Sequence, residues 1–443
     1  MSRLRPAASP AGSLSPSAAL RYLQDLQRFG IKLGLDNMRI LLAAFGDPHR
    51  DFPVVHVAGT NGKGSISAML AEIFARSGFK AGLYTSPHLV RVEERIRVGG
   101  RMIPGRDFRR ILGAVKAGIE ELLAAGRLDA SPTFFEVLTA AALLYFRERR
   151  VDVAVLEVGM GGRFDATNVV TPVVSVVANV ARDHMQYLGN TLEKIAFEKA
   201  GIIKPGVPVV SGVVGGQARP VIRRRAREEN APLTEVFGRD SSFDAGIGIF
   251  RKTAVYRLRD ETYRLAPGLP GAHQVRNAAV AAATSSVLKR LGFPIDRKIV
   301  ELGIRSARWE GRLELVARRP RVYLDGAHNE DGALALAAFI DETCPKPPVL
   351  VFAMMKDKAL ARVAGILFPR ASRIVLTAIP YPRAALPKEV LAATRRFSGR
   401  IAVEPDPAEA LRLARRMAGP AGTVVVTGSL FLVGEMKKIG FYG

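Results

Sequence analysis

The segment His56-Val-Ala-Gly-Thr-Asn-Gly-Lys-Gly-Ser65 follows a predicted strand, Pro53–Val57, and opens a predicted helix, Ser65–Arg76. A glycine-rich turn at such a junction lets backbone N–H groups converge on phosphate oxygens, and the helix N-terminus adds a favourable dipole. Lys63 would neutralise charge on the β- and γ-phosphates, and the Ser65 hydroxyl could contact magnesium. The segment therefore predicts a phosphate-binding loop at the start of a βα unit.

The match of this loop to the general pattern G-x-x-x-x-G-K-[ST] is imperfect. Val57 stands where the pattern has its first glycine, and Gly64 follows the lysine, so the hydroxyl comes one position late. Read without other motifs, the segment leaves open a glycine-rich strand-to-helix turn that binds no nucleotide.

Apolar strands and helical segments alternate downstream of the loop. The predicted strands are Ala81–Tyr84, Val151–Val158, Val173–Ala178 and Val207–Val210, and the helices between them include Pro132–Arg150 and Leu192–Ala200. Strands that alternate with helices favour a mainly parallel sheet covered on both faces. We expect an α/β protein whose N-terminal part is a P-loop mononucleotide-binding domain.

The domain organisation follows from the same pattern. Residues 1–17 are rich in Ala, Ser, Pro and Arg and are interpreted as a flexible leader rather than a transit peptide. Residues 18–304 form the predicted ATP-binding domain, in which Thr253–Leu258 belongs to a small antiparallel excursion and Gln274–Leu291 is a helix. Residues 305–311 form a predicted linker, and 312–443 a smaller, Rossmann-like α/β domain. Its predicted strands are Val322–Leu324, Val349–Ala353, Arg373–Thr377 and Thr423–Thr427.

The composition limits the classes of partner. The chain has 443 residues, of which 48% are hydrophobic and 24% charged, as in globular proteins of two or three domains. The net charge is +24, but no zinc-finger or RNA-binding signature accompanies it. We therefore expect no nucleic-acid partner; a solvated Arg-rich surface and a field that recruits anionic substrates both account for the charge.

The cysteine content and the hydropathy of the chain indicate its cellular compartment. Cys344 is the only cysteine, so an intrachain disulfide is impossible, which fits a reducing environment. We find no apolar stretch long enough to span a membrane and no signal-peptide core. The expected location is the cytoplasm, without a membrane partner.

Further motifs follow the loop in a fixed order. They are Tyr84-Thr-Ser-Pro-His-Leu89, Glu94-Arg-Ile96, Phe135-Glu-Val-Leu-Thr-Ala140, Glu157-Val-Gly-Met-Gly-Gly-Arg-Phe-Asp-Ala-Thr-Asn168, Glu198-Lys-Ala-Gly-Ile-Ile-Lys204, His273-Gln-Val-Arg-Asn277, Gly311-Arg-Leu-Glu314, Asp325-Gly-Ala-His-Asn329 and Thr427-Gly-Ser-Leu-Phe431. With Gly59–Ser65, this series resembles the Mur ligase superfamily, and within it the folylpolyglutamate synthase/dihydrofolate synthase branch. The resemblance runs from about Ala19 to the C-terminus.

The resemblance implies a ligase that uses ATP and Mg²⁺ to add L-glutamate to dihydropteroate, to the glutamate tail of reduced folates, or to both. In such enzymes a carboxylate attacks the γ-phosphate to form an acyl phosphate and ADP, and the glutamate amine then displaces phosphate. Positioning and electrostatic stabilisation carry most of that catalysis. The motifs serve either acceptor; we expect a bifunctional enzyme that acts as a monomer.

The resemblance also assigns residues, which we carry over position by position. Ser86 and Glu157 would hold one magnesium ion, and His184 a second. Lys63, His184 and Lys199 would be catalytic, with Lys199 carbamylated. The nucleotide would contact Gly59, Thr60, Asn61, Gly62, Lys63, Gly64 and Ser65 from the loop, and Asn277, Arg312, Asp325 and His328 from the C-terminal half.

Several of these residues have simpler readings outside the family. Lys199 beside Gly201 is otherwise a helix C-terminal lysine that the helix dipole favours. His184 would be a surface histidine, since histidine is an unusual magnesium ligand. Asp325 before Gly326 would start a turn, and Arg312 would form a salt bridge between domains. For Glu157, a helix cap or a salt bridge competes evenly with metal binding.

Three other functions compete at this level. A Mur-type ligase for a UDP-muramyl peptide would need a UDP-binding domain ahead of the loop, and Gly59 comes too early in the chain for one; a cyanophycin-type ligase is disfavoured by the arrangement of one loop and one C-terminal domain. A non-catalytic nucleotide-binding protein is disfavoured by intact Lys63, Glu157, His184 and Lys199. A nucleic-acid binder rests on charge alone.

Overall fold

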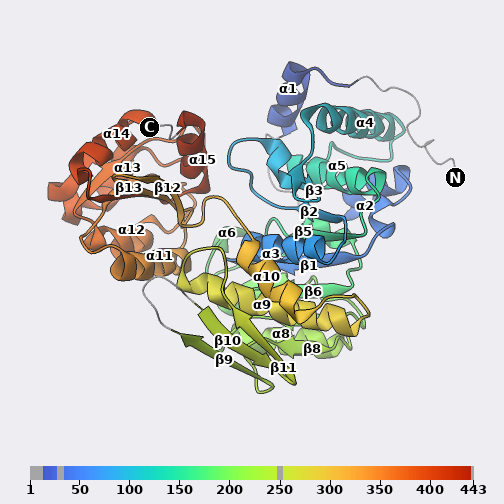
Figure 1. The fold of residues 1–443 in the computed structure, drawn as a ribbon. Helices are drawn as coiled ribbons and strands as arrows, with labels where there is room; N and C mark the ends of the chain where they lie inside the picture. Colours follow the sequence, from blue (N-terminus) through green and yellow to red (C-terminus); the bar gives the residue numbers. More distant parts are fainter. Residues whose placement is uncertain (1–12, 27–33, 247–252, 441–443) are drawn as a thin grey trace.

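The computed structural model describes residues 13–26, 34–246 and 253–440 (Figure 1). A sheet of eight strands forms the centre of the larger domain, in the order β4-β3-β2-β5-β1-β6-β7-β8. Its strands are β1 (Val54–Ala58), β2 (Ala81–Tyr84), β3 (Ile96–Val98), β4 (Arg101–Met102), β5 (Val153–Glu157), β6 (Val174–Val177), β7 (Val209–Ser211) and β8 (Leu233–Glu235).

Most strands of this sheet are parallel. Strands β2, β5, β1, β6, β7 and β8 run in one direction, and the hairpin of β3 and β4 extends the β2 edge in antiparallel fashion. Strands β1, β5 and β6 are buried along their whole length, as expected of apolar runs with a helix layer on each face. The predicted mainly parallel α/β architecture is confirmed.

Helices cover both faces of the large sheet. On one face lie α3 (Lys63–Arg76), α9 (Ala272–Arg290) and α10 (Arg297–Ser306), and on the other α1 (Pro16–Leu26), α2 (Asp36–Ala44), α4 (Gly105–Ala124) and α5 (Phe134–Glu148). Two more helices, α7 (Leu192–Ala200) and α8 (Ala218–Glu228), pack together near β7. The first helix begins at Pro16, so the last two residues of the predicted leader, 16 and 17, are helical; residues 1–12 lie outside the described part.

The predicted antiparallel excursion is a separate sheet of three strands. It consists of β9 (Ser241–Gly246), β10 (Thr253–Leu258) and β11 (Glu261–Leu265), all antiparallel. Its apolar face, with Tyr256 and Tyr263, joins the same core cluster as α3, α9 and α10. The sequence pattern did not predict α8 within the preceding segment.

A six-stranded sheet forms the centre of the smaller domain, in the order β12-β13-β17-β14-β15-β16. Its strands are β12 (Glu314–Arg318), β13 (Arg321–Leu324), β14 (Val349–Phe352), β15 (Arg373–Leu376), β16 (Ile401–Val403) and β17 (Thr423–Thr427). Helices α11 (Glu330–Thr343), α12 (Leu360–Leu367) and α13 (Pro387–Ala393) cover one face, and α14 (Pro407–Ala418) and α15 (Leu430–Ile439) the other.

The two domains lie side by side (Figure 1), and residues of the phosphate-binding loop, which follows the central strand β1, line one cavity with residues of the smaller domain. A Cβ atom added to Gly434 of α15 would lie 2.1 Å from the Leu89 carbonyl oxygen, so the smaller domain presses against the loop after β2. The first two residues of the predicted linker, 305–311, form the end of α10, and the other five lie between α10 and β12. Among the described residues, no helix combines the length and the apolar character that crossing a membrane requires.

Candidate active site

A cavity of about 300 Å³ lies between the two domains and is lined by every residue that the sequence singled out as a site residue. From the larger domain these are Gly59, Thr60, Asn61, Gly62, Lys63, Gly64, Ser65, Ser86, Glu157, His184 and Lys199. From α9 and the smaller domain they are Asn277, Arg312, Asp325 and His328. The carboxyl ends of parallel strands form the floor, which is where open α/β sheets place their sites.

The phosphate-binding loop is held by a residue that the sequence motifs did not identify. The Asn179 side-chain oxygen accepts hydrogen bonds from the backbone N–H groups of Thr60 (3.0 Å) and Asn61 (2.9 Å). The Thr60 hydroxyl donates to the Ala181 carbonyl oxygen at 3.1 Å and accepts from the Ala181 N–H at 3.0 Å. These contacts fix the loop to the segment after β6.

Two glycines of the loop permit close approach to other elements. Gly62 has a φ of +82°, and a Cβ atom there would lie 2.4 Å from the Asn277 side-chain oxygen. A Cβ atom at Gly64 would lie 2.7 Å from Nε1 of Trp309. The linker residue Trp309 therefore packs against the start of α3, and Asn277 of α9 against the loop itself.

The Lys63 ammonium folds back onto its own loop. Its Nζ donates to the carbonyl oxygens of Gly59 (3.1 Å) and Thr60 (3.2 Å). Burial lowers the pKa of Lys63, while the nearby carboxylates of Glu157 and Asp183 oppose that shift. The side chain is thus a buried cation near two acids, in the place where phosphate charge would be neutralised.

Ser65, Ser86 and Glu157 provide hard oxygen ligands at one end of the cavity. Glu157 ends β5 and is 4% exposed; its Oε2 accepts from the Ser86 backbone N–H at 3.1 Å. Burial raises the pKa of the Glu157 carboxyl, against the effect of Lys63. The Ser65 Oγ is buried without a hydrogen-bond partner. A divalent cation would satisfy both groups, so these residues fit a magnesium site.

The described residues contain no cluster of three or more His, Cys, Asp or Glu side chains able to hold a metal ion.

Lys199, in the last turn of α7, points into the cavity rather than to solvent. It is 3% exposed, and its Nζ donates to the Gly59 carbonyl oxygen at 3.0 Å, the same oxygen that Lys63 contacts. Burial, together with the charge of Lys63, lowers the pKa of Lys199 to about 7. A lysine that only interacts with the helix dipole would be exposed and fully charged. The alternative interpretation of Lys199 as such a lysine therefore does not describe this position.

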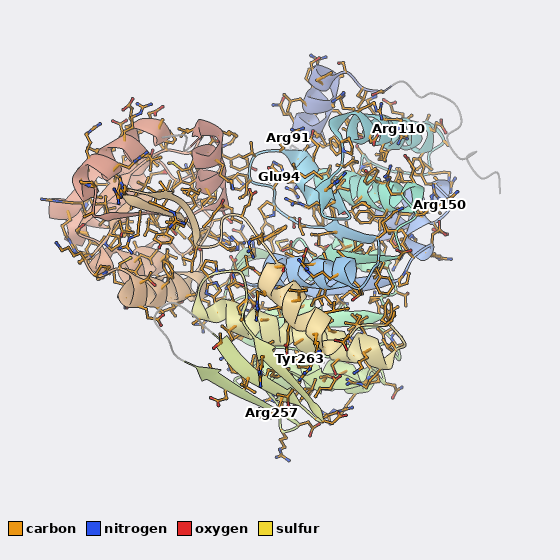
Figure 2. The ribbon with its side chains drawn as sticks, in the orientation of Figure 1. Arg91, Glu94, Arg110, Arg150, Arg257 and Tyr263 are labelled. Carbon is orange, nitrogen blue, oxygen red and sulfur yellow. The ribbon has the colours of Figure 1, made fainter. Side chains whose placement is uncertain are left out.

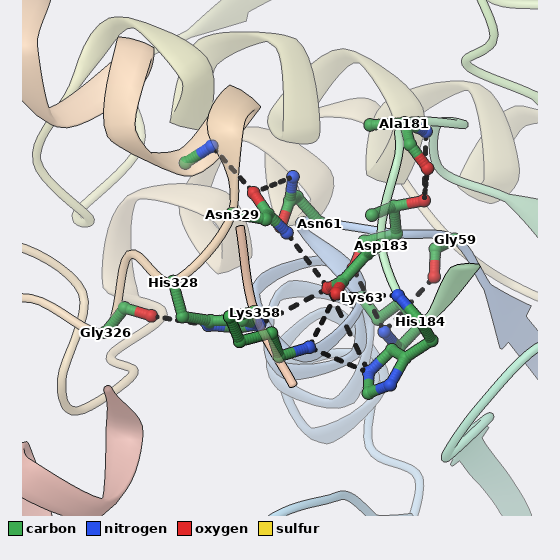
Figure 3. A network of polar contacts seen from close by, with 12 residues as sticks. Gly59, Asn61, Lys63, Ala181, Asp183, His184, Gly326, His328, Asn329 and Lys358 are labelled. Carbon is green, nitrogen blue, oxygen red and sulfur yellow. Dashed lines mark hydrogen bonds and ion pairs between the residues drawn. The ribbon is translucent and has the colours of Figure 1, made fainter. Parts of the chain in front are cut away.

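Asp183 is the centre of a polar network that joins the two domains (Figure 3). Its carboxylate accepts from Lys358 Nζ (2.5 Å) and Asn329 Nδ2 (3.1 Å), and His328 Nε2 lies 3.4 Å away. Burial would raise the pKa of the Asp183 carboxyl, but His328, His184 and Lys358 hold it well below its usual range. Asn61 and Asn329 exchange amide hydrogen bonds of 3.0 and 3.2 Å beside it.

His184 sits at the edge of this network. It adopts a left-handed backbone conformation with a φ of +48°, and its Nε2 lies 3.3 Å from Lys358 Nζ. Burial lowers the pKa of His184 to about 4, although Asp183 opposes the shift. The imidazole is therefore neutral near pH 7, the form in which a histidine can bind a metal ion.

The C-terminal residues face the same cavity with different partners. The buried Asp325 carboxylate accepts from the backbone N–H groups of Leu313 and Ala327, both at 2.9 Å, so it fixes the segment before β12 to the segment after β13. Arg312 donates to the Gly311 carbonyl oxygen at 3.2 Å and lowers the pKa of Asp325, which burial raises. His328 contacts the Gly326 carbonyl oxygen at 2.8 Å through Nδ1.

Four residues of the site were absent from the sequence-based set: Asn179, Asp183, Asn329 and Lys358. Asp183 directly precedes His184, and Asn329 directly follows His328 in the quoted segment Asp325–Asn329, so proximity to those histidines was an available signal. Asn179 directly follows a predicted strand. Lys358 lies in a loop after β14 with no motif around it, and nothing in its local sequence marks it.

Comparison with known proteins identifies two domain families along the chain. The family described as Mur ligase middle domain matches residues 57–285, and the glutamate ligase domain of Mur ligases matches residues 311–430.

Relatives of similar length match almost the whole chain. The dihydrofolate synthase/folylpolyglutamate synthase of Bacillus subtilis is 36% identical over 431 residues, which cover 95% of this chain and 98% of that protein. A solved structure of Escherichia coli FolC in complex with DHPP and ADP is 31% identical, has a TM-score of 0.86, and covers 96% of this chain and 98% of its own. Folylpolyglutamate synthase of Mycobacterium tuberculosis complexed with ADP is 29% identical with a TM-score of 0.88, covering 96% and 99%.

Proposed function

The chain belongs to the Mur ligase family, in its dihydrofolate synthase/folylpolyglutamate synthase branch, and we propose that its single interdomain site joins L-glutamate to dihydropteroate as well as to reduced folates. It is an ATP-dependent ligase that forms a carbon–nitrogen bond. The observation that supports this proposal most strongly is that the residues carried over from the family line one cavity, although they come from both domains.

In the first step, the acceptor carboxylate oxygen attacks the γ-phosphorus of ATP, and the bond to the β-phosphate oxygen breaks. ADP and an acyl phosphate result. The backbone N–H groups of residues 59–65 would surround the phosphates at the N-terminus of α3, and Lys63 would turn from the loop carbonyls to the γ-phosphate. Arg312 would contact the phosphates from the other domain with its planar donor fork.

Magnesium would be held by Glu157 and by the hydroxyls of Ser65 and Ser86, and a second ion by His184. When bound, it screens the negative charge that gathers on the phosphates. The unpartnered Ser65 Oγ and the buried Glu157 carboxylate support this assignment.

Lys199 would carry a carbamate that supports the second magnesium ion. The ammonium first loses one proton; the neutral Nζ then attacks carbon dioxide and loses a second proton, so the side chain changes from a cation to an anionic carbamate. Burial supports this, because a lysine with a pKa near 7 holds a large neutral fraction at physiological pH. We expect Lys199→Ala to lose most activity and to regain part of it with a small carboxylate such as acetate. Full activity of Lys199→Ala without additives would contradict the carbamate.

In the second step, the glutamate amine attacks the acyl carbon, phosphate leaves, and the nitrogen loses a proton. Transfer of oxygen tests this route directly. Dihydropteroate labelled with ¹⁸O in its carboxylate should pass one labelled oxygen to inorganic phosphate during each turnover. Phosphate without label would contradict an acyl-phosphate intermediate.

We further propose that the enzyme acts as a monomer in the cytoplasm on small molecules, without nucleic acid or membrane partners. An intracellular location fits the requirement for ATP, and the presence of both halves of the site in one chain supports a monomer. Light scattering after gel filtration should give a mass near 47.9 kDa at working concentrations. A stable dimer would contradict the monomer but not the activity.

A further inference from the structure

A groove on the surface of the larger domain starts beside the catalytic cavity. It consists of two hollows, one of about 680 Å³ between α6 (Met185–Leu188), α7 and α8, and one of about 390 Å³ between α7, α8 and the start of α2. Phe197 of α7 lines both hollows, so they adjoin. We call the two together the outer groove.

The outer groove and the catalytic cavity adjoin at two places. Leu188, at the end of α6, lines both spaces and packs on Gly161 of the cavity wall, where an added Cβ atom would lie 2.9 Å from Leu188 Cδ2. At the end of α7, Lys199 lines the cavity and the preceding Glu198 lines the outer groove. A ligand that extends out of the cavity past Leu188 therefore enters this groove.

Exposed aromatic side chains gather in the outer groove. Tyr187, Phe197 and Phe164 are 42%, 45% and 37% exposed, and within the described parts of the chain no other aromatic side chain is among the exposed large apolar ones. All three line the groove, and the Arg163 guanidinium lies 4.7 Å from the ring centre of Phe164 and 5.1 Å from that of Phe197. Aromatic rings and a planar guanidinium held open to solvent form a surface on which a flat ring can stack.

Basic side chains outnumber acidic ones along the outer groove. Arg39, Arg224 and Arg225 pair with carboxylates close to them in sequence. Among the residues that the structure describes, no carboxylate forms an ion pair with the other four cations, which therefore remain for a ligand with several carboxylates. The lining cations are Arg39, Arg163, Lys194, Lys204, Arg224, Arg225 and Arg227, and the lining carboxylates are Asp36, Glu193 and Glu198.

The chemistry of the acceptor explains why such a groove is needed. The reacting carboxylate must reach ATP, whatever the length of the acceptor. Each further γ-linked glutamyl residue lengthens the chain between that carboxylate and the pteridine ring, and moves the ring roughly 6 Å farther away when extended. The cavity of about 300 Å³ must also hold ATP and L-glutamate. The ring of a folate with several glutamyl residues therefore lies outside the cavity.

We propose that the outer groove binds folates that already carry several glutamyl residues. The pteridine ring stacks on Phe197 and its aromatic neighbours, and carboxylates of the tail pair with Lys194, Arg227 and the other unpaired cations. Each glutamyl residue of the tail carries an α-carboxylate that does not react, so the charge of this ligand matches the charge of the groove. Dihydropteroate has no such tail, and its ring does not reach the groove. The inference rests on the function proposed above.

The test measures KM for dihydropteroate and for the mono-, tri- and pentaglutamates of tetrahydrofolate in wild type, Phe197→Ala and Arg227→Gln. We expect Phe197→Ala to raise the KM for the longer acceptors by about 5- to 50-fold, as for loss of ring stacking, and Arg227→Gln by about 3- to 10-fold. The KM for dihydropteroate should change by about twofold or less in both variants. The same factor for every acceptor, or no change for any, would overturn the inference.

Two exposed residues outside the outer groove provide matched controls. Leu302→Ala removes an apolar side chain that is 45% exposed, as Phe197 is. Arg150→Gln removes a charge that in Figure 2 lies on the side of the larger domain away from the smaller domain. Both controls should match wild type with every acceptor. A loss on the longer acceptors as large as in Phe197→Ala or Arg227→Gln would show that the effect does not belong to the groove.

A second arm separates the ring from the tail by calorimetric titration. γ-Linked pentaglutamate without a pteridine ring should bind wild type and Phe197→Ala equally, because it has no ring to stack, and should bind Arg227→Gln more weakly. In wild type, loss of the ring from the ligand should weaken binding about as much as Phe197→Ala weakens binding of the complete pentaglutamate. Equal binding of the ring-free tail by wild type and Arg227→Gln would contradict the pairing of the tail with these cations.

The proposed function fails in a different way. Wild-type enzyme that turns over dihydropteroate but no folate acceptor would contradict both the bifunctional proposal and the role of the outer groove. Wild-type enzyme that uses all acceptors, with the same dependence on tail length in Phe197→Ala and Arg227→Gln, would overturn the role of the groove alone. A wild-type dimer that Phe197→Ala converts to a monomer in light scattering would identify the aromatic surface as a subunit interface and would also overturn the inference.

Discussion

Lys63 and Lys199 place two amino groups against one carbonyl oxygen, that of Gly59, at 3.1 and 3.0 Å. Two buried ammonium groups so close together repel each other, and burial removes the water that would stabilise them. The arrangement favours loss of a proton from one of them and the arrival of an anion at the other. The phosphate and the carbamate that we propose at Lys63 and Lys199 would satisfy both demands.

The depressed pKa of Lys199 makes a prediction about stability and pH. The unfolded lysine keeps its proton up to about pH 10.5, whereas the folded one loses it near pH 7. Below pH 7 the fold must hold a buried charge; between pH 7 and 10.5 the unfolded state binds more protons, so stability rises with pH. Lys199→Met should therefore be more stable than wild type at pH 6.5, and the difference should shrink by about 1–3 kcal/mol at pH 9.

Urea titrations in buffer free of carbon dioxide would measure this difference, since a carbamate would remove the charge by another route. A gap in the free energy of unfolding that is the same at both pH values would show that Lys199 has an ordinary pKa in the folded enzyme.

A second prediction for single residues concerns the charged side chains of Lys63 and Glu157, which would lie beside the phosphates and the metal ion. Lys63→Ala and Glu157→Ala should each lower kcat by about 10³-fold or more, because each removes a charge that acts where negative charge gathers. The thermal transition should stay close to that of wild type. Initial rates of ADP release at saturating ATP measure the effect, with exposed Lys346→Ala as the control. A Glu157→Ala enzyme within tenfold of wild type would remove the basis of the metal assignment.

At the scale of elements, the loop between β1 and α3 depends on close contact with α9. The positive φ of Gly62 and the nearness of Asn277 both exclude a side chain at this position. Backbone strain and overlap with Asn277 would both act on a side chain at position 62. A glycine with a similar φ but no close neighbour separates the two effects.

Gly62→Ala should weaken ATP binding at least about tenfold, because the added methyl group overlaps the Asn277 amide and shifts the loop. Gly78 is the control: its φ of +88° is similar, but no atom lies within 4 Å of an added Cβ. Calorimetric titration with ATP and magnesium compares the two variants. Equal affinities for Gly62→Ala and Gly78→Ala would contradict the role of the contact with α9.

The elements that the sequence predicted are those with strong local signals. Strands β1, β2, β5, β6 and β17 are short, mostly apolar runs, and α7 matched its predicted range of Leu192–Ala200. Helix α8 was missed because arginine occupies much of it, and its buried residues are only Ala218, Val221, Ile222 and Ala226. The short strands β12 and β16 are partly exposed, so periodicity carried little information there.

The residues of the site also divide into those that local sequence could predict and those that it could not. Residues inside recognisable motifs, such as Lys63 and Glu157, could be predicted to share a cavity. Lys358 could not, because its importance comes from the pairing of two domains and from burial beside Asp183, which no local pattern encodes.

At the scale of the whole molecule, polar contacts between the domains lie beside the site itself. Lys358 pairs with Asp183 where both side chains are less than 10% exposed, and the amides of Asn61 and Asn329 meet beside them. Asn61 and Asp183 line the cavity and also take part in these contacts, so substrate binding and domain position are expected to be coupled.

Lys358→Met should loosen this coupling, because it leaves Asp183 buried with less compensating charge. We expect a larger radius of gyration in X-ray scattering without ligands and a kcat lowered by about tenfold or more. Lys356→Met on the same loop is the control, since Lys356 is half exposed and pairs with Glu389 at the surface. Scattering and rates indistinguishable from wild type in Lys358→Met would remove Lys358 from the interdomain contact.

The most direct test of the account is glutamate-dependent ADP release in the presence of magnesium, measured with 7,8-dihydropteroate and with tetrahydrofolate as acceptor. The account predicts turnover with both acceptors, each requiring L-glutamate and each lost in Lys63→Ala. Turnover with one acceptor would restrict the enzyme to one synthase activity. No glutamate-dependent ADP release with either acceptor would contradict the assignment of this site to folate ligation.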